Sequence, residues 1–140
     1  MIRNSVAIFG GVIIAVIVVM GVEFIGHSLF PVIENIENNS PDQTAEFLAR
    51  VPIGALLFVP LAWFLGSVCG GLVAVFIAGS RPVMMASIVG GFIFAAAVYV
   101  LLAIPHPVWL IVVGIGSIML SVVITSKIGS RLVGDDTPTV

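Results

Sequence analysis

Charged side chains are scarce in this 140-residue chain: they make up 9% of it, with five Lys or Arg and seven Asp or Glu. Hydrophobic residues make up 60%, and the mean hydropathy is +1.29. Soluble globular domains carry about 25% charged residues, so this composition excludes an ordinary water-soluble fold. It indicates an integral membrane protein.

Two further scarcities narrow the class of protein. Cysteine occurs once, at Cys69, so no intrachain disulfide can form and the redox compartment cannot be inferred. Basic residues are few and form no run, and the net charge is −2. Nucleic-acid-binding domains carry a basic patch, so we expect no nucleic acid among the partners.

The few charges leave long stretches of the chain uncharged. No Asp, Glu, Lys or Arg lies between Arg3 and Glu23, between Arg50 and Arg81, or between Arg81 and Lys127. About 20 helical residues cross the hydrocarbon core of a bilayer. The third stretch is too long for one crossing, and Pro105-His106-Pro107 breaks it, because each proline disfavours helix at the residue before it.

These stretches predict an all-α membrane protein, a four-transmembrane-helix antiparallel bundle. The expected spans are roughly 5–28, 52–78, 83–104 and 108–128, and they leave an outer loop, 31–50. The whole chain, 1–140, is expected to form a single integral membrane domain. A cleaved signal peptide is the rival interpretation of the N-terminus, but the first apolar run exceeds the usual ~7–15-residue core of such a peptide.

Basic residues near the span ends predict the orientation in the membrane. They divide unevenly between the two sides: one side has Arg3, Arg81, Lys127 and Arg131, and the other has Arg50. Since Lys and Arg accumulate on the cytoplasmic side, we expect both termini in the cytoplasm of a bacterial-type inner membrane or a plasma membrane. Loop 31–50 then lies at the outer face, together with Glu23 and the two histidines.

Loop 31–50 carries the signal of a short helix. Ser40 or Asp42 can cap its first turn, and Pro41 suits an early helical position. The apolar residues Phe47 and Leu48 near its end predict a face that lies against the bundle or the membrane.

Small residues recur every four positions in three of the spans. In lipid such stripes let helix backbones approach closely, because no hydrophobic effect drives association there. Two interpretations remain open: the stripes form internal seams of the bundle, or the stripe in span 52–78 forms a homo-oligomer interface. The stripes consist of Ala62, Gly66, Gly70, Ala74 and Ala78; of Ser117, Ser121, Thr125 and Gly129; and of Ala86 and Gly90.

A faint internal similarity suggests two duplicated helical hairpins. Gly10-Gly11-Val12-Ile13 is similar to Gly90-Gly91-Phe92-Ile93, and Gly79-Ser80-Arg81 is similar to Gly129-Ser130-Arg131. Convergence of low-complexity apolar sequence explains the similarity equally well, so both origins stay open.

One acidic residue, Glu23, lies inside an expected span, and His27 follows it by one helical turn. This spacing places both side chains on one face of a helix. An ionisable group at this depth is energetically costly and marks a candidate functional site. The cost falls if the carboxylate is protonated, pairs with a cation or binds a metal.

Residues of other spans can complete a site around Glu23. A metal site of Glu23, His27 and His106 would suit a divalent transition metal such as zinc, because carboxylate and imidazole are its ligands. Alternatively, a hydrogen-bonded polar cluster ties the outer helix ends together. The residues expected to support such a cluster are Tyr99, at a similar depth to Glu23; Arg50, at the entry of the second span; and Trp63, which lies deeper.

These interpretations give three candidate functions. The first is a structural, accessory or oligomer-forming component of the membrane, in which the polar cluster fixes helix packing. The second is binding or transport of a cation or small ligand, and the third is transport or signalling coupled to protonation of Glu23.

An enzyme is not expected, because Ser28 follows His27 directly. Their side chains diverge around the helix and leave no nucleophile paired with a base. The lipid bilayer is a partner in every case. A chain this small is expected to act as a homo-oligomer or as a subunit of a larger membrane complex.

Overall fold

The computed structural model describes residues 2–31 and 40–134, and within these ranges the chain is helical with no β-strand. Five helices follow one another: α1 (Ile2–Leu29), α2 (Pro41–Arg50), α3 (Ile53–Ala78), α4 (Pro82–Ala103) and α5 (Val108–Val133). All except α2 are long and apolar enough to cross a membrane. The predicted all-α fold with four spans is confirmed.

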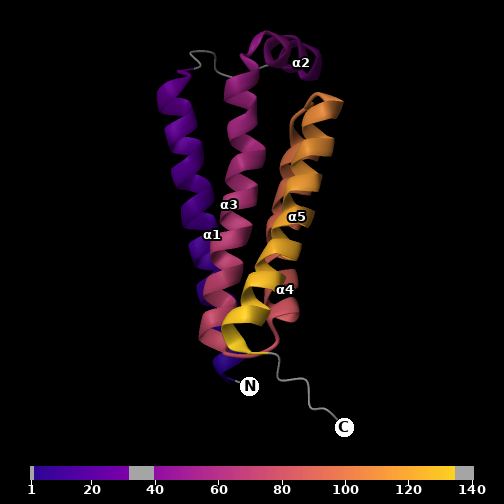
Figure 1. The fold of residues 1–140 in the computed structure, drawn as a ribbon. Coiled ribbons are helices and arrows are strands. Elements are labelled where there is room, and N and C mark those ends of the chain that lie inside the picture. The colour runs from indigo at the N-terminus through magenta and orange to yellow at the C-terminus, as the bar shows by residue number, and fades with distance from the viewer. Residues whose placement is uncertain (1, 32–39, 135–140) are drawn as a thin grey trace.

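The four long helices stand side by side, and each runs opposite to the long helix before it (Figure 1). α2 lies across one end of the bundle, and both chain termini lie at the opposite end. We call these the α2 end and the termini end. It follows that α3 and α5 run parallel from the α2 end to the termini end, while α1 and α4 run back.

The turns between spans form where glycine and proline predict them. Gly79 ends α3 with a φ of 60°, and Arg81 adopts a φ of 52° just before α4. Pro105-His106-Pro107 separates α4 from α5. The largest difference from the predicted spans is α5, which continues through Gly129 to Val133 instead of ending near 128.

α2 is the short helix predicted within loop 31–50. The Gln43 backbone N–H donates to the Ser40 hydroxyl (3.4 Å), and the Ser40 backbone N–H donates to the Gln43 side-chain oxygen (2.9 Å). This reciprocal cap starts the helix. Leu48 of α2 is buried against Leu56 of α3 and Leu110 of α5. α2 therefore lies against the bundle, while the predicted loop residues 32–39 fall outside the described ranges.

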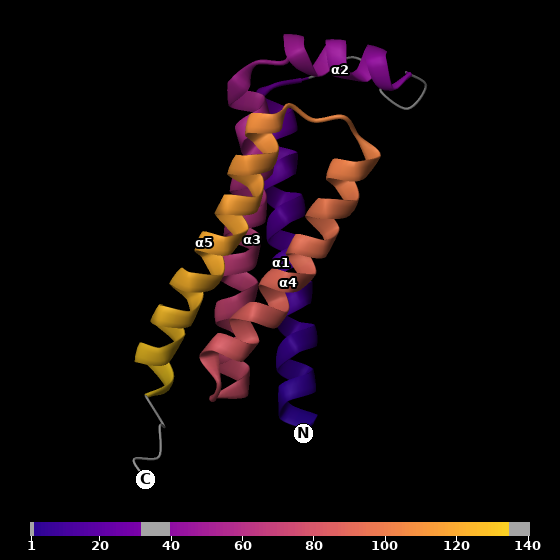
Figure 2. The same cartoon turned by 90° about the vertical axis from the view of Figure 1, so that its right-hand side faces the viewer.

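α3 is the central helix of the bundle. It packs against α1, α4 and α5, whereas α1 touches α4 over a much smaller area. Within their most apolar segments, 50% of the α3 residues are buried but only 17% of the α1 residues. α4 leans away from α1 toward the α2 end (Figure 2). Most of the surface of α1 is therefore left for lipid or for another protein.

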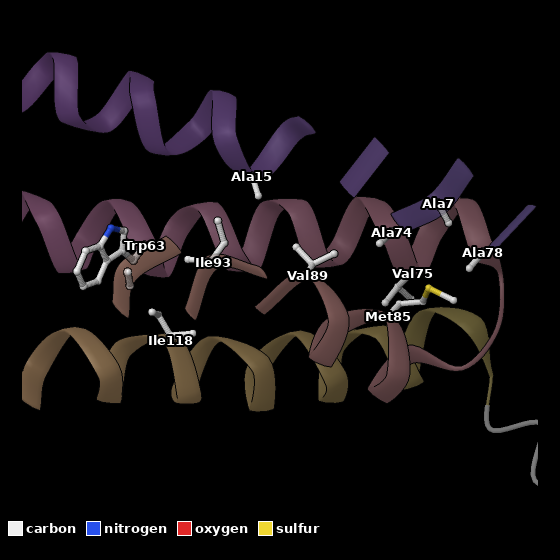
Figure 3. Packing of buried hydrophobic residues seen from close by; sticks show 11 residues of the cluster. Ala7, Ala15, Trp63, Ala74, Val75, Ala78, Met85, Val89, Ile93 and Ile118 are labelled. Carbon is white, nitrogen blue, oxygen red and sulfur yellow. The ribbon is translucent and has the colours of Figure 1, made fainter. Parts of the chain in front are cut away.

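The core of the bundle is built from alanine and branched side chains with one methionine, Met85, and one tryptophan. Figure 3 shows Ala15 and Ala74 at the contact between α1 and α3, with Val89 reaching in from α4. Trp63 lies toward the α2 end of this core, beside Ile93. Because so many of the buried side chains are small, the helix axes can lie close together.

The contact between α1 and α3, which we call the glycine seam, is a close approach of two backbones. A Cβ on Gly11 would lie 2.6 Å from the carbonyl oxygen of Gly70 and 2.8 Å from the Cβ of Ala74. A Cβ on Gly66 would lie 2.9 Å from the carbonyl oxygen of Ala15. No side chain fits at these points, so the seam depends on glycine.

The contact between α3 and α5, which we call the hydroxyl seam, is built differently. The Ser117 hydroxyl lies within hydrogen-bond distance of two carbonyl oxygens, that of Pro60 on α3 (3.2 Å) and that of Gly114 on its own helix (2.7 Å). Trp63 lies against Gly114, where a Cβ would be 2.7 Å from the indole ring. This seam therefore combines a polar bond between helices with an aromatic ring seated on glycine.

The small-residue stripes thus form internal seams of a single chain. All five stripe residues of α3 are buried, namely Ala62, Gly66, Gly70, Ala74 and Ala78. Three of the four stripe residues of α5 are buried as well, namely Ser121, Thr125 and Gly129. The interpretation of the α3 stripe as a homo-oligomer interface is wrong, because the other helices of the same chain already cover it.

The two halves of the faint internal similarity lie in different environments. Gly11 is pressed against α3, whereas the corresponding Gly91 has no atom within 4 Å of a built Cβ. Duplication of a helical hairpin stays a prediction, and the packing at this pair of positions does not strengthen it.

Candidate functional site

Glu23 lies near the α2 end of α1, on a turn whose rotation is fixed by aromatic contacts. Gly26 faces Phe58 of α3, where a Cβ would lie 2.8 Å from the ring. Phe58 also packs edge-on against Phe30, with ring centroids 6.1 Å apart. Since Gly26 faces α3, Glu23 lies on the flank of α1 beside that contact, and its side chain is half-buried.

His27 is exposed and lies one turn after Glu23. Its Nδ1 atom is 2.8 Å from the backbone carbonyl oxygen of Glu23. A carbonyl oxygen only accepts, so Nδ1 carries the hydrogen, and Nε2 is the ring nitrogen left for another partner. The two residues share a face as predicted. The imidazole of His27, however, is held by the backbone carbonyl group of Glu23 and not by its side-chain carboxylate.

The carboxylate of Glu23 forms no hydrogen bond or ion pair with any residue of the ranges 2–31 and 40–134. Three serines of the spans are satisfied by their own helices: Ser28, Ser126 and Ser130 donate to carbonyl oxygens one turn earlier. Glu23 is also the only acidic residue within the four spans. The single chain therefore leaves one ionisable group unsatisfied at membrane depth.

The predicted metal ligands are not brought together. His106 lies in the turn between α4 and α5, where its Nδ1 is 2.7 Å from the carbonyl oxygen of Ile104. Among the described residues, no group of three or more His, Cys, Asp or Glu could hold a metal ion. The structure therefore gives no support to the predicted metal site of Glu23, His27 and His106.

No hydrogen bond or ion pair joins Glu23 to the three described residues that were predicted to support a polar cluster. Arg50, at the end of α2, forms an ion pair with Glu46 one turn earlier. Tyr99 is 75% exposed on α4 and forms no hydrogen bond with Glu23. Trp63 is buried in the hydroxyl seam. What remains of the predicted cluster is a pair of residues on one helix.

The sequence did not predict that two hydroxyl groups would be buried without a hydrogen-bond partner. Ser67 on α3 is 2% exposed and Thr125 on α5 is 1% exposed, and neither side-chain oxygen has a hydrogen-bond partner in the described structure. Thr125 packs onto Gly71, one turn after Ser67. The spacing of small residues marks the stripe, but it does not show which hydroxyls reach a carbonyl oxygen.

Comparison with known proteins adds no further constraint on the site. No protein-family model, no curated protein and no solved structure matches this chain. The fold and the site therefore define its class by themselves. The chain is a small helical membrane protein with four spans that pack against one another. It carries one ionisable pair, Glu23 and His27, on its least covered helix.

Proposed function

We propose that the protein is a non-catalytic accessory component of a membrane complex, and that it contacts a partner membrane protein through Glu23 and His27 on α1. The observation that carries the proposal is the half-buried carboxylate of Glu23, which has no bonding partner within the described chain. A charged side chain costs about 2.5–3.5 kcal/mol at the middle of a spanning helix and less toward its ends, and Glu23 lies in the last two turns of α1. A donor supplied by a partner would offset part of that cost.

The surface around Glu23 suits a helix of a partner protein. Met20 is 65% exposed and Phe24 is 73% exposed, so apolar side chains flank the carboxylate. Nε2 of His27 extends the polar contact by one helical turn. α1 is also the least covered of the four spans. A partner helix therefore finds both apolar area and a hydrogen-bonding pair on this side of the bundle.

The chemistry of Glu23 restricts the group that the partner presents. An ionised carboxylate only accepts hydrogen bonds, so the partner must bring a donor such as Lys, Arg, His or a hydroxyl. A second copy of this chain meets that requirement when its His27 is protonated on both ring nitrogens, so that Nε2 donates as well as Nδ1. In a two-fold pair, Glu23 of each copy can reach His27 of the other, because an isologous interface uses the same surface twice.

The other two candidate functions have less support. Cation binding lacks a third ligand among the described residues. Proton-coupled transport needs polar groups at several depths, and Glu23 is the only acidic residue within the four spans. An accessory role requires only what α1 presents on its surface.

The size of the complex in native membranes tests the proposal. The full chain and its Glu23→Ala, Glu23→Gln and His27→Ala variants would be released in mild detergent and compared on native gels. Glu46→Gln is the matched control, because Glu46 is acidic, lies near the same end and already pairs with Arg50. We expect an assembly larger than the monomer for the wild type and the control, and loss of that assembly for Glu23→Ala.

Two further measurements distinguish the possible partners of Glu23. Co-purification of two differently tagged copies identifies the partner as a second copy of the chain. Glu23→Gln should keep the assembly if the partner donates from a neutral group, and should lose it if the partner is a cation.

Thermal unfolding of the purified protein distinguishes an interaction surface from a packing role. The carboxylate of Glu23 has no bond inside the described chain, so Glu23→Ala should leave the Tm unchanged or raise it. A wild type that migrates as a monomer would contradict the proposal. So would a lowered Tm of Glu23→Ala with an unchanged assembly.

A further inference from the structure

Basic residues gather at the termini end of the bundle. Four of the five Lys and Arg residues belong to elements at this end: Arg3 in the first turn of α1, Arg81 before α4, and Lys127 and Arg131 in the last turns of α5. All four are exposed, and none pairs with an acidic side chain in the described ranges. We call these four residues the basic cluster.

The helices that carry the basic cluster pack around the turn between α3 and α4. The Arg3 guanidinium lies 3.8 Å from a Cβ built on Gly79 in this turn. On its α5 side, Pro82 packs onto Gly129, where a Cβ would lie 2.8 Å from the proline Cβ. Gly129 lies between the two basic residues of α5 in the sequence. Lys127 and Arg131 lie two positions from Gly129 and therefore project from the opposite side of α5. Positive charge from α1, α5 and the turn is thus distributed around the termini end of the bundle.

Exposed apolar side chains accompany each member of the basic cluster. Next to or within two residues of the cluster lie Ile2, Val83, Ile128 and Leu132, and all of them are exposed. Long basic side chains at the end of a span direct their charge to the headgroup layer while apolar neighbours remain among acyl chains. This pairing fits an amphipathic ligand better than a free anion.

We propose that the basic cluster binds the headgroups of anionic phospholipids in the leaflet at the termini end. Lipid phosphates would pair with these guanidinium and ammonium groups around the end of the bundle, and the acyl chains of those lipids would run along the exposed apolar residues of α1, α4 and α5. This binding does not depend on the contact of Glu23, which lies near the opposite end of α1.

Thermal unfolding of the detergent-purified full chain tests this proposal. Phosphatidylglycerol and phosphatidylcholine with identical acyl chains would be titrated separately. We expect phosphatidylglycerol to raise the Tm at lower concentrations than phosphatidylcholine, and the difference to shrink as salt is added. The double variant Lys127→Gln/Arg131→Gln should weaken the apparent affinity for phosphatidylglycerol about 25-fold, because each basic residue contributes roughly fivefold.

Matched variants keep the outcome unambiguous. Arg50→Gln removes a charge at the α2 end and should bind phosphatidylglycerol like the wild type. Lys127→Arg/Arg131→Lys keeps the charge and should retain binding, which controls for damage to the fold. Arg81→Gln is a second test outside α5 and should also weaken the affinity.

Three results would overturn the proposal. One is equal stabilisation by the two lipids, and another is undiminished affinity of Lys127→Gln/Arg131→Gln and Arg81→Gln. The third is a shift of the Tm by inorganic phosphate as large as that by phosphatidylglycerol at the same concentration. That last result would assign the cluster to a free anion instead of a lipid.

Discussion

The glycine seam and the hydroxyl seam lie on two sides of the same helix and use small residues for different purposes. In the glycine seam, Gly11 and Gly70 remove side chains so that the backbones of α1 and α3 meet. In the hydroxyl seam, Ser117 reaches a carbonyl oxygen across the interface, and Trp63 occupies the space that Gly114 leaves free. One seam depends on the absence of atoms and the other on specific atoms.

The difference shows how a small chain stabilises a bundle in lipid. Apolar side chains gain little by leaving lipid for a protein interior, so packing and hydrogen bonds decide which helices associate. The glycine seam uses packing alone and tolerates no added atom, whereas the hydroxyl seam adds one polar bond between helices. Substitutions should therefore have large effects in the first seam and graded effects in the second.

The largest effect is expected for Gly70→Leu in the glycine seam. A Cβ on Gly70 already collides with Gly11, and it would lie 2.6 Å from the Cβ of Ala15. Overpacking commonly costs about 1–3 kcal/mol, and contact with a rigid backbone places this variant at or above the upper end. Gly21→Leu on α1 is the control, because a Cβ there has nothing within 4 Å. Reversible unfolding in detergent, followed by circular dichroism, measures both; equal stabilities would show that α1 does not lie on this face of α3.

A smaller loss is expected for Gly114→Ala in the hydroxyl seam. Its Cβ would lie 2.7 Å from the indole ring of Trp63, and the ring can shift where a backbone cannot, so we expect a loss of about 1–2 kcal/mol. Gly116→Ala on the same helix meets no atom within 4 Å and should be neutral or slightly stabilising. Tryptophan fluorescence should change for Gly114→Ala alone. A loss equal to that of Gly70→Leu would erase the distinction between the seams.

The smallest effects are expected for two serines, with opposite sign. Ser117→Ala removes the bond to the carbonyl oxygen of Pro60 and should destabilise by about 0.6 kcal/mol, the average for such bonds in membranes. Ser67→Ala removes a buried hydroxyl with no partner in the described structure and should leave the free energy of unfolding unchanged or raise it. Destabilisation by both variants to the same extent would show that Ser67 is bonded in solution.

The sequence allowed the elements to be predicted because their signals are local. Uncharged stretches locate the spans, Ser40 and Pro41 mark the start of α2, and Gly79 closes α3. Helix rotation is a different matter. A lipid-facing surface is as apolar as a buried one, so the amphipathic signal that orients helices in soluble proteins is missing here. The spacing of small residues therefore located the stripe of α3 but did not predict which helices pack against it.

The candidate site shows the same limit. Glu23 and His27 could be paired from their spacing, because one helix fixes their geometry. The expected depth of Tyr99 was not enough to pair it with Glu23, because depth leaves the rotation of α4 open, and that side chain lies on the exposed side of the helix. His106 belongs to the turn between α4 and α5, where its ring nitrogen lies against the carbonyl oxygen of Ile104 and not against Glu23. Contacts between distant spans required the packed structure.

Disulfide trapping across the glycine seam tests most directly whether this seam is internal to one chain. Gly10→Cys and Ile77→Cys would be combined with Cys69→Ala, because a Cβ on Gly10 would lie 3.2 Å from the terminal methyl carbon of Ile77, an atom that the second substitution removes. Disulfides need Cβ atoms about 3.5–4.5 Å apart. After mild oxidation in membranes, we predict an intramolecular disulfide and a monomer that migrates faster on a non-reducing gel. Disulfide-linked dimers in its place would contradict the internal seam and return the α3 stripe to an interface between copies.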